Sequence, residues 1–320
     1  MKSQQSHQPH VAVLIPCYNE ELSVSKVITD FRNALPDAEI YVFDNNSTDS
    51  TCAVARSAGA TVITAHHQGK GNVVRRMFAD VDADVYIMVD GDATYDASAA
   101  RTLMNALIDQ NLDMVVGCRV DEGEAENYRP GHRWGNLLLT RAVSTIFGGE
   151  FTDMLSGYRA FSRRFVKSFP ALAKGFEIET ELTIHALELR MPYGEVPTRY
   201  GARPEGSVSK LSTYKDGFRI LFTIMRFYMT ERPVHFFSLI GGLLAGASLL
   251  LFFPVLAHYL QSGDVPRLPT AILSFGLLLA GVLSFLCGLI LDNVTRGRRE
   301  IRRLAYLSAP RLDLRRRHAQ

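Results

Sequence analysis

The sequence predicts an α/β domain built on a mostly parallel sheet, followed by an amphipathic helix and two transmembrane helices. Three observations support this. Short apolar runs alternate with helical patterns over the first 117 residues, a segment of mixed apolar and basic residues follows, and two long uncharged runs come after it. The hydrophobic fraction of 47% and the charged fraction of 21% are those of a folded protein. A length of 320 residues suggests about two domains.

The first 117 residues have the pattern of buried parallel strands that alternate with helices. The expected strands are residues 11–15, 39–43, 61–64, 85–89 and 113–117, and the expected helices are residues 21–34, 51–58, 73–79 and 99–109. Ligands bind such sheets at the carboxyl ends of the strands. The residues directly after each strand are therefore the ones most informative about function.

Two apolar runs, residues 234–260 and 269–291, have the length of transmembrane helices, since about 20 helical residues cross a hydrocarbon core about 30 Å thick. Buried core helices are the alternative, but a run of this length without charge is typical of a membrane span. Nine arginines follow the second run, and lysines and arginines precede the first, whereas the connector 261–268 holds one acid and one base. The positive-inside rule places both ends in the cytoplasm.

The segment 212–231 has the pattern of an amphipathic helix. One face carries Phe218, Leu221, Phe222, Met225, Tyr228 and Met229, and another carries Lys215, Arg219 and Arg226. Such a helix lies at a membrane interface with its cations near anionic headgroups. A core helix with a charged, solvated face is the alternative, and the position directly before a span favours the interface.

Cysteine usage and the N-terminus bear on the compartment. The four cysteines are scattered without metal-ligand spacing, which argues against a disulfide framework and a zinc site. The first ten residues hold no apolar stretch of a signal peptide. We expect a cytoplasmic domain (1–210), an amphipathic juxtamembrane helix (211–232), spans at 233–260 and 269–291, and a basic cytoplasmic tail (292–320), all in the cytoplasmic (inner) membrane. No nucleic-acid partner is expected.

The triplet Asp90-Gly91-Asp92 directly follows the strand expected at 85–89. Two carboxylates at this spacing can bind Mg²⁺ or Mn²⁺, which would bridge the diphosphate of a nucleotide-sugar and neutralise the leaving group. An ordinary surface turn is the alternative. The position after a buried strand favours the metal site.

Polar motifs follow three other strands. Pro16-Cys17-Tyr18-Asn19-Glu20 and Asp44-Asn45-Asn46-Ser47-Thr48-Asp49 offer side chains to a base and ribose, and helix capping is the alternative for both. Gly69-Lys70-Gly71 offers a flexible loop with one cation for a phosphate, although it lacks the P-loop spacing.

Together these motifs resemble glycosyltransferase family 2. The order and spacing of PxYNE, DNNSTD, GKG and DGD carry the resemblance. Residues 117–119 (GCR), 153–159 (DMLSGYR), 175–179 (GFEIE) and 203–210 (RPEGSVSK) are similar to the dolichyl-phosphate mannose synthase branch. The similarity covers residues 10–215, with a two-span tail known from bacterial polyprenyl-phosphate members.

The resemblance implies a GT-A-type (Rossmann-like) fold. It also implies inverting transfer of a sugar from a UDP- or GDP-sugar to undecaprenyl or dolichyl phosphate, with Mg²⁺ or Mn²⁺, in a homo-oligomer such as a tetramer. The implied metal ligands are Asp90 and Asp92. The implied nucleotide-sugar contacts are Pro16, Tyr18, Asn19, Glu20, Asp44, Asn46, Gly69, Lys70, Asp90 and Gly91. Asp92 and Asp153 are the implied catalytic residues. If a base is used, Asp153 is the best carboxylate, ahead of Glu177 and Glu179.

The implied contacts to the acceptor phosphate are Arg119, Arg133, Arg203, Ser209 and Lys210. A phosphate monoester carries about −1.5 to −2 charge at neutral pH, so it needs positive ligands. For any single arginine, an ordinary surface ion pair is the alternative. RPEGSVSK has one residue more than the branch's RxxGxSK, which leaves the pairing of Ser207 and Ser209 open.

Several alternatives stay open. Asn45 stands where the family usually has a second aspartate, so recognition of the base, uridine or guanosine, is undecided, as is the sugar. Transfer to a neutral lipid, or a non-catalytic scaffold that binds nucleotide-sugars, are the rival functions. A processive synthase is disfavoured because Arg133-Trp134 lacks the glutamine that a QxxRW motif would have.

Overall fold

The computed structural model of the chain describes residues 9–120, 132–204 and 213–310. The chain forms two compact units. The first comprises Met1–Leu221 and Arg302–Gln320, and the second comprises Phe222–Ile301. The first is an α/β domain and the second is helical.

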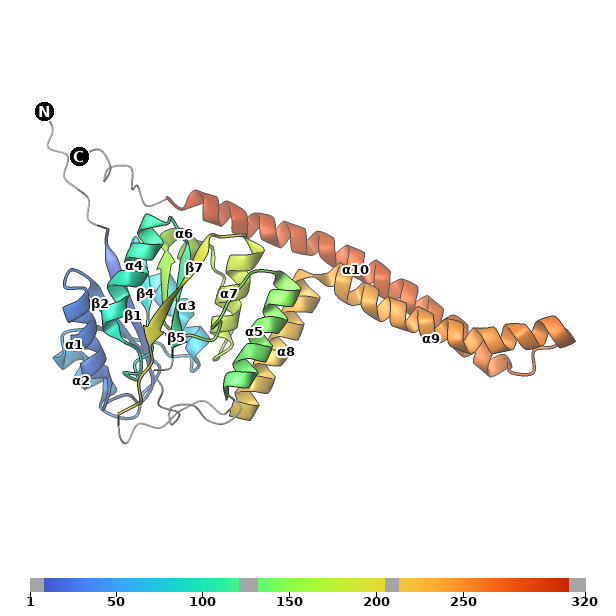
Figure 1. Cartoon of the computed structure of the whole chain (residues 1–320), viewed down its shortest axis with the longest axis horizontal. Helices are drawn as coiled ribbons and strands as arrows, with labels where there is room; N and C mark the ends of the chain where they lie inside the picture. The colour runs from blue at the N-terminus through green and yellow to red at the C-terminus, as the bar shows by residue number, and fades with distance from the viewer. Residues whose placement is uncertain (1–8, 121–131, 205–212, 311–320) are drawn as a thin grey trace, which may run out of the picture. The chain divides into compact units, whose positions relative to one another are not determined.

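Within the described residues, a seven-stranded sheet with the order β3-β2-β1-β4-β6-β5-β7 forms the centre of the first unit (Figure 1). The strands are β1 (Val11–Cys17), β2 (Glu39–Asp44), β3 (Thr61–Thr64), β4 (Val85–Met88), β5 (Met114–Val120), β6 (Arg159–Ser162) and β7 (Tyr193–Arg199). β6 runs antiparallel to β4 and β5, and the remaining pairings are parallel. The predicted mostly parallel sheet and its five predicted strands are confirmed. β6 and β7 were not predicted.

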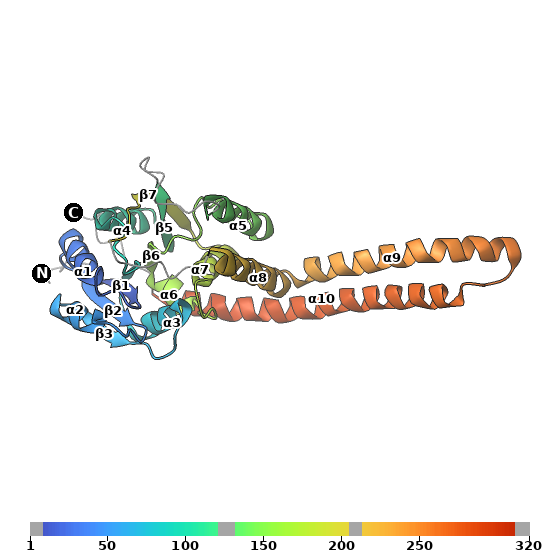
Figure 2. The ribbon, with the colours of Figure 1, turned by 90° about the horizontal axis from the view of Figure 1, so that it is seen from below.

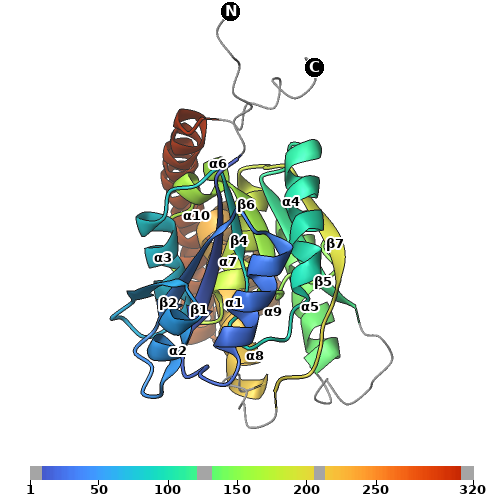
Figure 3. The same cartoon turned by 90° about the vertical axis from the view of Figure 1, so that its left-hand side faces the viewer.

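Helices cover both faces of this sheet (Figure 3). They are α1 (Val24–Ala34), α2 (Thr51–Ser57), α3 (Lys70–Asp80), the 3₁₀ turn η1 (Ala97–Ala99), α4 (Ala100–Asp109), α5 (His132–Phe147), α6 (Arg163–Ser168) and α7 (Ile178–Glu188). Phe31 of α1 and Leu103 of α4 pack on the face that carries Ile15 and Ile87. On the other face, Phe78 of α3 meets the rings of Tyr86 and Phe161 edge-on. Burial on both faces explains why the strands read as continuous apolar runs.

Two helix starts differ from the sequence prediction. α1 begins at Val24 because the Ser23 hydroxyl donates to the Glu20 carboxylate and to the Gly91 carbonyl, which holds the preceding residues in a turn. α3 begins at Lys70, directly after Gly69, whose φ of 118° is open to glycine but not to other residues. Both turns lie at the carboxyl edge of the sheet, and both position site residues.

The second unit contains the two described helices that are long and apolar enough to cross a membrane. α9 (Pro233–Ser262) and α10 (Leu268–Ser308) run side by side (Figure 2). A Cβ on Gly241 would lie 2.8 Å from the Gly281 carbonyl oxygen, so glycine permits the close helix approach. In each helix only 17% of the most apolar stretch is buried, so most apolar side chains face outward. The two predicted apolar helices are confirmed, and α10 continues beyond residue 291 to Ser308.

The predicted amphipathic segment is helix α8 (Thr213–Glu231). Five apolar side chains of its predicted face are exposed: Phe218, Leu221, Phe222, Met225 and Met229. Ile220 and Ile224 are buried, and Arg226 is exposed. The side chains of Lys215 and Arg219 lie outside the described residues.

Candidate active site

The parallel strands bring most of the predicted site residues to one edge of the sheet. The motifs that begin at Cys17, Asp44, Val89 and Arg119 lie at the carboxyl ends of β1, β2, β4 and β5, which are joined in one sheet. Segments from α3, α7 and the residues after β7 complete this edge through ion pairs.

Asp90 and Lys70 form one half of a charged cluster. The Lys70 ammonium lies 2.5 Å from Asp90 Oδ1 and 2.5 Å from Glu179 Oε1 of α7. Lys70 is only 9% exposed. The GKG cation and the first carboxylate of DGD are therefore in direct contact, and Glu179 is the second partner of the lysine.

The pKa values of these groups follow from the pairing. Burial alone would lower the pKa of Lys70, but the charges of Asp90 and Glu179 outweigh it and raise that pKa above its usual value. Burial raises the pKa of Glu179, and the Lys70 charge opposes this shift. Lys70 is therefore a fixed positive charge at the carboxyl edge of the sheet.

Asp92 forms the other half of the cluster. Arg203 Nη2 lies 2.6 Å from Asp92 Oδ2, while the Thr94 hydroxyl and backbone N–H donate to Oδ1 at 2.6 and 3.3 Å. Asp92 is buried. Both carboxylates of the DGD triplet are thus paired with a basic side chain of the protein.

A second arginine binds the carboxylate that opens the DMLSGYR segment. Arg119 donates from Nε and Nη2 to the two oxygens of Asp153, each at 2.7 Å, in a bidentate pair. Its guanidinium also lies 5.5 Å from the centre of the Tyr200 ring. The planar fork of arginine suits such a pair.

The rest of the DMLSGYR segment shapes the site. A Cβ on Gly157 would lie 2.4 Å from Asp90 Oδ2, so only glycine lets this carboxylate approach. The Ser156 hydroxyl donates to the Gly117 carbonyl at 2.6 Å. The fully buried Arg159 donates to the Ser156 carbonyl at 3.0 Å and to the Met154 carbonyl, which fixes the turn.

The motifs after β1 and β2 bind each other. Asn19, with φ of 53°, donates its N–H to the Ser47 hydroxyl at 2.9 Å and accepts from the Thr48 N–H at 2.8 Å. The Asp44 carboxylate accepts from the Ser47 N–H, and the Glu20 N–H donates to Thr51. Asp44 and Glu20 are buried, whereas Tyr18 and Pro16 are half-buried. These bonds hold the two loops together as one wall of the site.

Asn45, the departure from the usual aspartate, has a structural role. Its amide Nδ2 donates to the carbonyls of Ala65 and His67 at 3.0 and 2.8 Å, and its Oδ1 accepts from the Gly69 N–H at 2.7 Å. Asn46 similarly donates to the His66 carbonyl at 2.6 Å. Asn45 therefore holds the segment that leads into the GKG loop, and only an amide can make all three bonds.

Two other acids at the start of α7, Glu181 within the helix and Glu177 directly before it, bind backbone groups. Glu181 accepts from the N–H groups of Leu172 and Ala173 at 2.9 and 2.7 Å, and Glu177 accepts from the Lys174 and Gly175 N–H groups. These are the contacts expected of acids near a helix N-terminus. They shape the loop against which the GKG turn packs, since a Cβ on Gly69 would lie 2.1 Å from the Lys174 carbonyl oxygen.

The side chains of three predicted acceptor residues lie outside the part of the chain that the structure describes. Arg133 belongs to α5, but its side chain lies outside the described residues. Ser209 and Lys210 also lie outside them.

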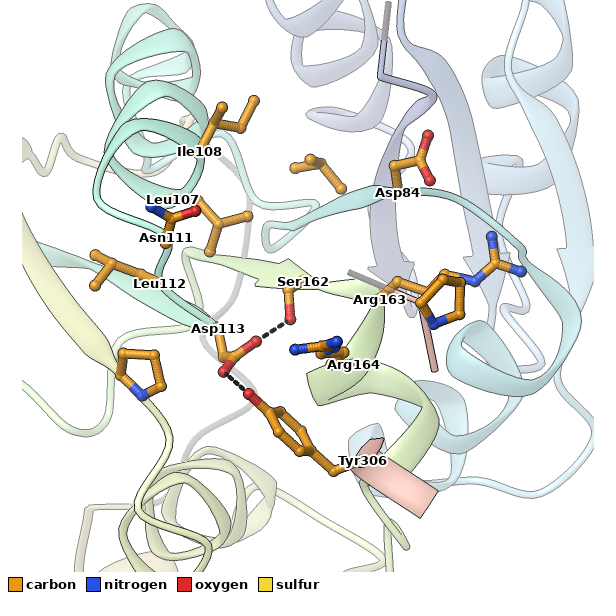
Figure 4. Close-up of a pocket in the computed structure, with 13 residues that line it drawn as sticks. Asp84, Leu107, Ile108, Asn111, Leu112, Asp113, Ser162, Arg163, Arg164 and Tyr306 are labelled. Carbon is orange, nitrogen blue, oxygen red and sulfur yellow. Dashed lines mark hydrogen bonds between the residues drawn. The ribbon is translucent and has the colours of Figure 1, made fainter. Parts of the chain in front are cut away.

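A cavity of about 240 Å³ lies at the opposite edge of the sheet, next to the amino ends of β4, β5 and β7 (Figure 4). There Asp113 accepts from the hydroxyls of Ser162 and Tyr306 at 2.6 and 2.8 Å, and the Arg164 guanidinium lies 5.4 Å from the Tyr306 ring centre. The end of α10 is bound at this edge through Tyr306. The cavity is separate from the DGD cluster.

Comparison with known proteins identifies the family. The glycosyl transferase family 2 model matches residues 12–169. Glycosyltransferase AglJ of Haloferax volcanii is 33% identical over 298 residues, which cover 91% of this chain and 95% of that protein. The chain belongs to glycosyl transferase family 2. The dolichol-phosphate mannosyltransferase of Pyrococcus furiosus is 26% identical over 279 residues, covering 82% of this chain and 78% of that protein.

The fold has a counterpart among solved structures. Glucosyl-3-phosphoglycerate synthase from Mycobacterium tuberculosis, in complex with Mn²⁺, UDP-glucose and phosphoglyceric acid, superposes with a TM-score of 0.56 at 20% identity. The match covers 69% of this chain and 80% of that one. The predicted GT-A fold is therefore confirmed, and the chain is a family 2 glycosyltransferase enzyme with two apolar C-terminal helices.

Several residues of the charged cluster in this glycosyltransferase were not predicted as such from the sequence. Glu179 was predicted as a less favoured base or as a structural acid at a helix N-terminus, whereas it is the second partner of Lys70. Thr94, which holds Asp92, and Tyr95, whose hydroxyl accepts from the Gly157 N–H at 2.9 Å, were not predicted. Thr94 and Tyr95 lie two and three residues after Asp92, and this proximity was the available signal.

Proposed function

We propose that this glycosyltransferase moves a sugar from a UDP- or GDP-sugar to polyprenyl phosphate at the cytoplasmic face of a membrane, with inversion at the anomeric carbon. The observation that carries the proposal is the gathering of Lys70, Arg119 and Arg203 at the same edge of the sheet as the DGD carboxylates. A donor diphosphate and an acceptor phosphate both need such cations. Relatives named as transferases of sugars to dolichyl or polyprenyl phosphate support this acceptor.

Asp90 and Asp92 fit a divalent cation, Mg²⁺ or Mn²⁺. Both belong to one triplet directly after β4, and carboxylate oxygens are the ligands that these hard cations prefer. Nη1 of Arg203 is buried without a hydrogen-bond partner among the described residues, which leaves a donor for an incoming anion. The described residues hold no group of three or more His, Cys, Asp or Glu side chains with metal-site geometry. Two carboxylates plus substrate phosphates is a usual arrangement for Mg²⁺. The cation would neutralise charge on the departing diphosphate.

For the donor, the loops after β1 and β2 form the proposed base and ribose wall through Pro16, Tyr18, Asn19, Glu20, Asp44 and Asn46. Lys70 lies next to Asp90, where its fixed positive charge would bind the diphosphate. Gly69 and Gly91 are proposed to contact the donor through their backbone, since the space of a side chain is taken by the Lys174 carbonyl at Gly69 and by Cys17 Sγ at Gly91.

For the acceptor, Arg119 and Arg203 are the proposed phosphate ligands within the described residues, and Arg133, Ser209 and Lys210 remain proposed from the sequence. In the transfer step, a phosphate oxygen of the acceptor forms a bond to the anomeric carbon. The bond from that carbon to the β-phosphate oxygen breaks, and the nucleoside diphosphate leaves with the electron pair. Asp153 orients Arg119, and it is the proposed base if the acceptor arrives as a monoanion. Positioning and charge neutralisation would supply most of the catalysis.

The membrane proposal rests on α8, α9 and α10. The exposed apolar side chains of α8, such as Phe218 and Phe222, suit an interface between headgroups and acyl chains. In intact cells, a membrane-impermeant thiol reagent should modify Asp264→Cys in the connector and should leave Ser57→Cys, an exposed position on α2, unmodified. The reverse labelling would place the catalytic domain on the other side.

A sugar-transfer screen tests the reaction. Detergent-purified protein with Mg²⁺ or Mn²⁺ receives UDP- and GDP-sugars in turn, with undecaprenyl phosphate or the matching neutral polyprenol as acceptor. We expect transfer to the phosphate from one donor, loss of transfer in Asp92→Asn, and full activity in Asp109→Asn, an exposed aspartate of α4. Transfer to polyprenol alone would refute the phosphate acceptor. Metal-dependent nucleotide binding without any transfer would indicate a scaffold.

A further inference from the structure

The two basic side chains that pair with the DGD carboxylates are held very differently. Lys70 lies between two carboxylates and is 9% exposed. Arg203 has the single carboxylate Asp92 as its ion-pair partner among the described residues, is 24% exposed, and has Nη1 buried without a hydrogen-bond partner there. Moving Lys70 would break two ion pairs, whereas moving Arg203 would break one.

Backbone contacts hold Arg203 close to Asp92. The segment after β7 is bound to the segment after DGD, because the Gly201 N–H donates to the Thr94 carbonyl at 2.8 Å and Tyr200 forms an antiparallel β-bridge with Tyr95. Thr94 also holds Asp92 through its hydroxyl. The backbone thus keeps the guanidinium within reach of the cluster even when the ion pair with Asp92 breaks.

Arg203 and a metal ion would compete for the Asp92 carboxylate. The carboxylate is buried, Oδ2 is occupied by Arg203 and Oδ1 by Thr94. A buried carboxylate without a cation is strongly unfavourable. A metal ion on Oδ2 would lie beside the Arg203 guanidinium, and repulsion between the two positive charges favours one cation at a time on this oxygen.

Resting on the metal site proposed above, we infer that Arg203 is an internal placeholder for the metal ion on Asp92. Metal binding releases the guanidinium, which then binds a substrate phosphate. Binding of the metal and of that phosphate is thereby coupled, since each ligand favours the state in which the Arg203–Asp92 pair is broken. Arg203 is a positioning residue for the order of binding as well as a phosphate ligand.

The first test is Mn²⁺ affinity without substrate, measured from the electron paramagnetic resonance signal of free Mn²⁺. Arg203→Gln removes the competitor and should bind Mn²⁺ about tenfold more tightly than wild type, within the range typical of coupled sites. Arg203→Lys can still pair with Asp92 and should stay near wild type. Arg119→Gln removes a positive charge whose partner is Asp153, and it controls for a general change in electrostatic potential.

The outcomes separate the inference from the site on which it rests. Wild-type or weaker Mn²⁺ affinity in Arg203→Gln would overturn the placeholder while leaving the metal site intact, and equal tightening in Arg119→Gln would do the same. Unchanged Mn²⁺ affinity in Asp92→Asn would refute the metal site, and the placeholder with it. Thermal unfolding of each variant checks that it is folded.

A second measurement finds which phosphate receives the guanidinium. With saturating Mn²⁺, the affinities of wild type and Arg203→Gln are compared for UDP and GDP and for farnesyl phosphate, a short acceptor analogue. A loss of tenfold or more for the nucleotides assigns Arg203 to the donor diphosphate, and a similar loss for farnesyl phosphate assigns it to the acceptor. No loss for either would overturn the second half of the inference.

Discussion

Replacing Asn45 with the aspartate usual in the family should damage this protein rather than improve it. Asn45 is buried, and its Nδ2 donates to the carbonyls of Ala65 and His67 at 3.0 and 2.8 Å. In Asn45→Asp both donors disappear, and a carboxylate oxygen then faces two carbonyl oxygens. The bond from the Gly69 N–H is the one that the carboxylate can keep.

The magnitude follows from these contacts. Each lost hydrogen bond is worth about 1 kcal/mol, and leaving a buried acceptor unsatisfied adds about 1–3 kcal/mol. We expect Asn45→Asp to lower the free energy of unfolding of the catalytic domain by about 3 kcal/mol. For a domain of this size, that lowers the unfolding midpoint by about 6–12 °C. Because Asn45 also holds the start of the GKG loop, KM for the donor should rise.

Differential scanning calorimetry of the detergent-purified protein measures the midpoint. Asn33→Asp, an exposed position on α1, is the matched control and should change stability by less than about 0.5 kcal/mol. A midpoint for Asn45→Asp within 2 °C of wild type, about the size of the control's effect, would refute the structural role assigned to the amide. The residue would then be free to contact the base.

Three further predictions concern buried groups. Glu179→Gln leaves Lys70 with Asp90 as its one charged partner, so the metal concentration for half-maximal rate should rise about tenfold, as second-shell changes commonly do; an unchanged titration would contradict this. Burial lowers the pKa of His185 to about 3, whereas in the unfolded chain it is about 6.5. Because the unfolded state binds a proton first as the pH falls, the free energy of unfolding is unaffected above pH 6.5 and is about 2 kcal/mol lower at pH 5. His185→Leu should abolish that decline in unfolding midpoint, and an identical decline in both proteins would exclude His185 as its source. Tyr306→Phe deprives a buried carboxylate of one donor and should lower stability by about 1–2 kcal/mol, measured as a lower midpoint at pH 7.5.

How far the sequence predicted the fold depended on how each strand is buried. β1 and β4 are buried throughout or nearly so, and their apolar runs marked them clearly. β7 lies at the sheet edge, carries Pro197 and is mostly half-buried, so neither an apolar run nor an alternation is present. β6 has four residues and begins with the buried Arg159, whose charge hides the strand. Hydrophobic patterns in a sequence predict strands that are buried on one or both faces. They fail for a half-buried edge strand such as β7 and for a strand with a buried charge such as β6.

The sequence predicted site residues that lie in short motifs, but not the ion pairs between residues far apart in the chain. DGD and GKG were recognised from their positions after strands, and the structure joins them through Lys70 and Asp90. The pairing of Lys70 with Glu179, or of Asp92 with Arg203, links residues more than 100 positions apart. No local pattern specifies such contacts, since they depend on how the strands are ordered in the sheet.

The charges of the assembled cluster give a physical reason for an order of events. The carboxylates of Asp90, Asp92, Asp153 and Glu179 face the cations Lys70, Arg119 and Arg203, and the charge of the buried Arg159 also acts on Glu179 and Asp153. When all are ionised, four negative and four positive charges balance, so the cluster has no net charge that attracts a phosphate. One divalent ion gives the cluster a net positive charge and frees Arg203 from Asp92, so the same residues then favour a phosphate. The cluster is thus suited to bind the metal before, or together with, the phosphates, and Arg203→Gln, with one positive charge fewer, should bind phosphates weakly even when the metal is present.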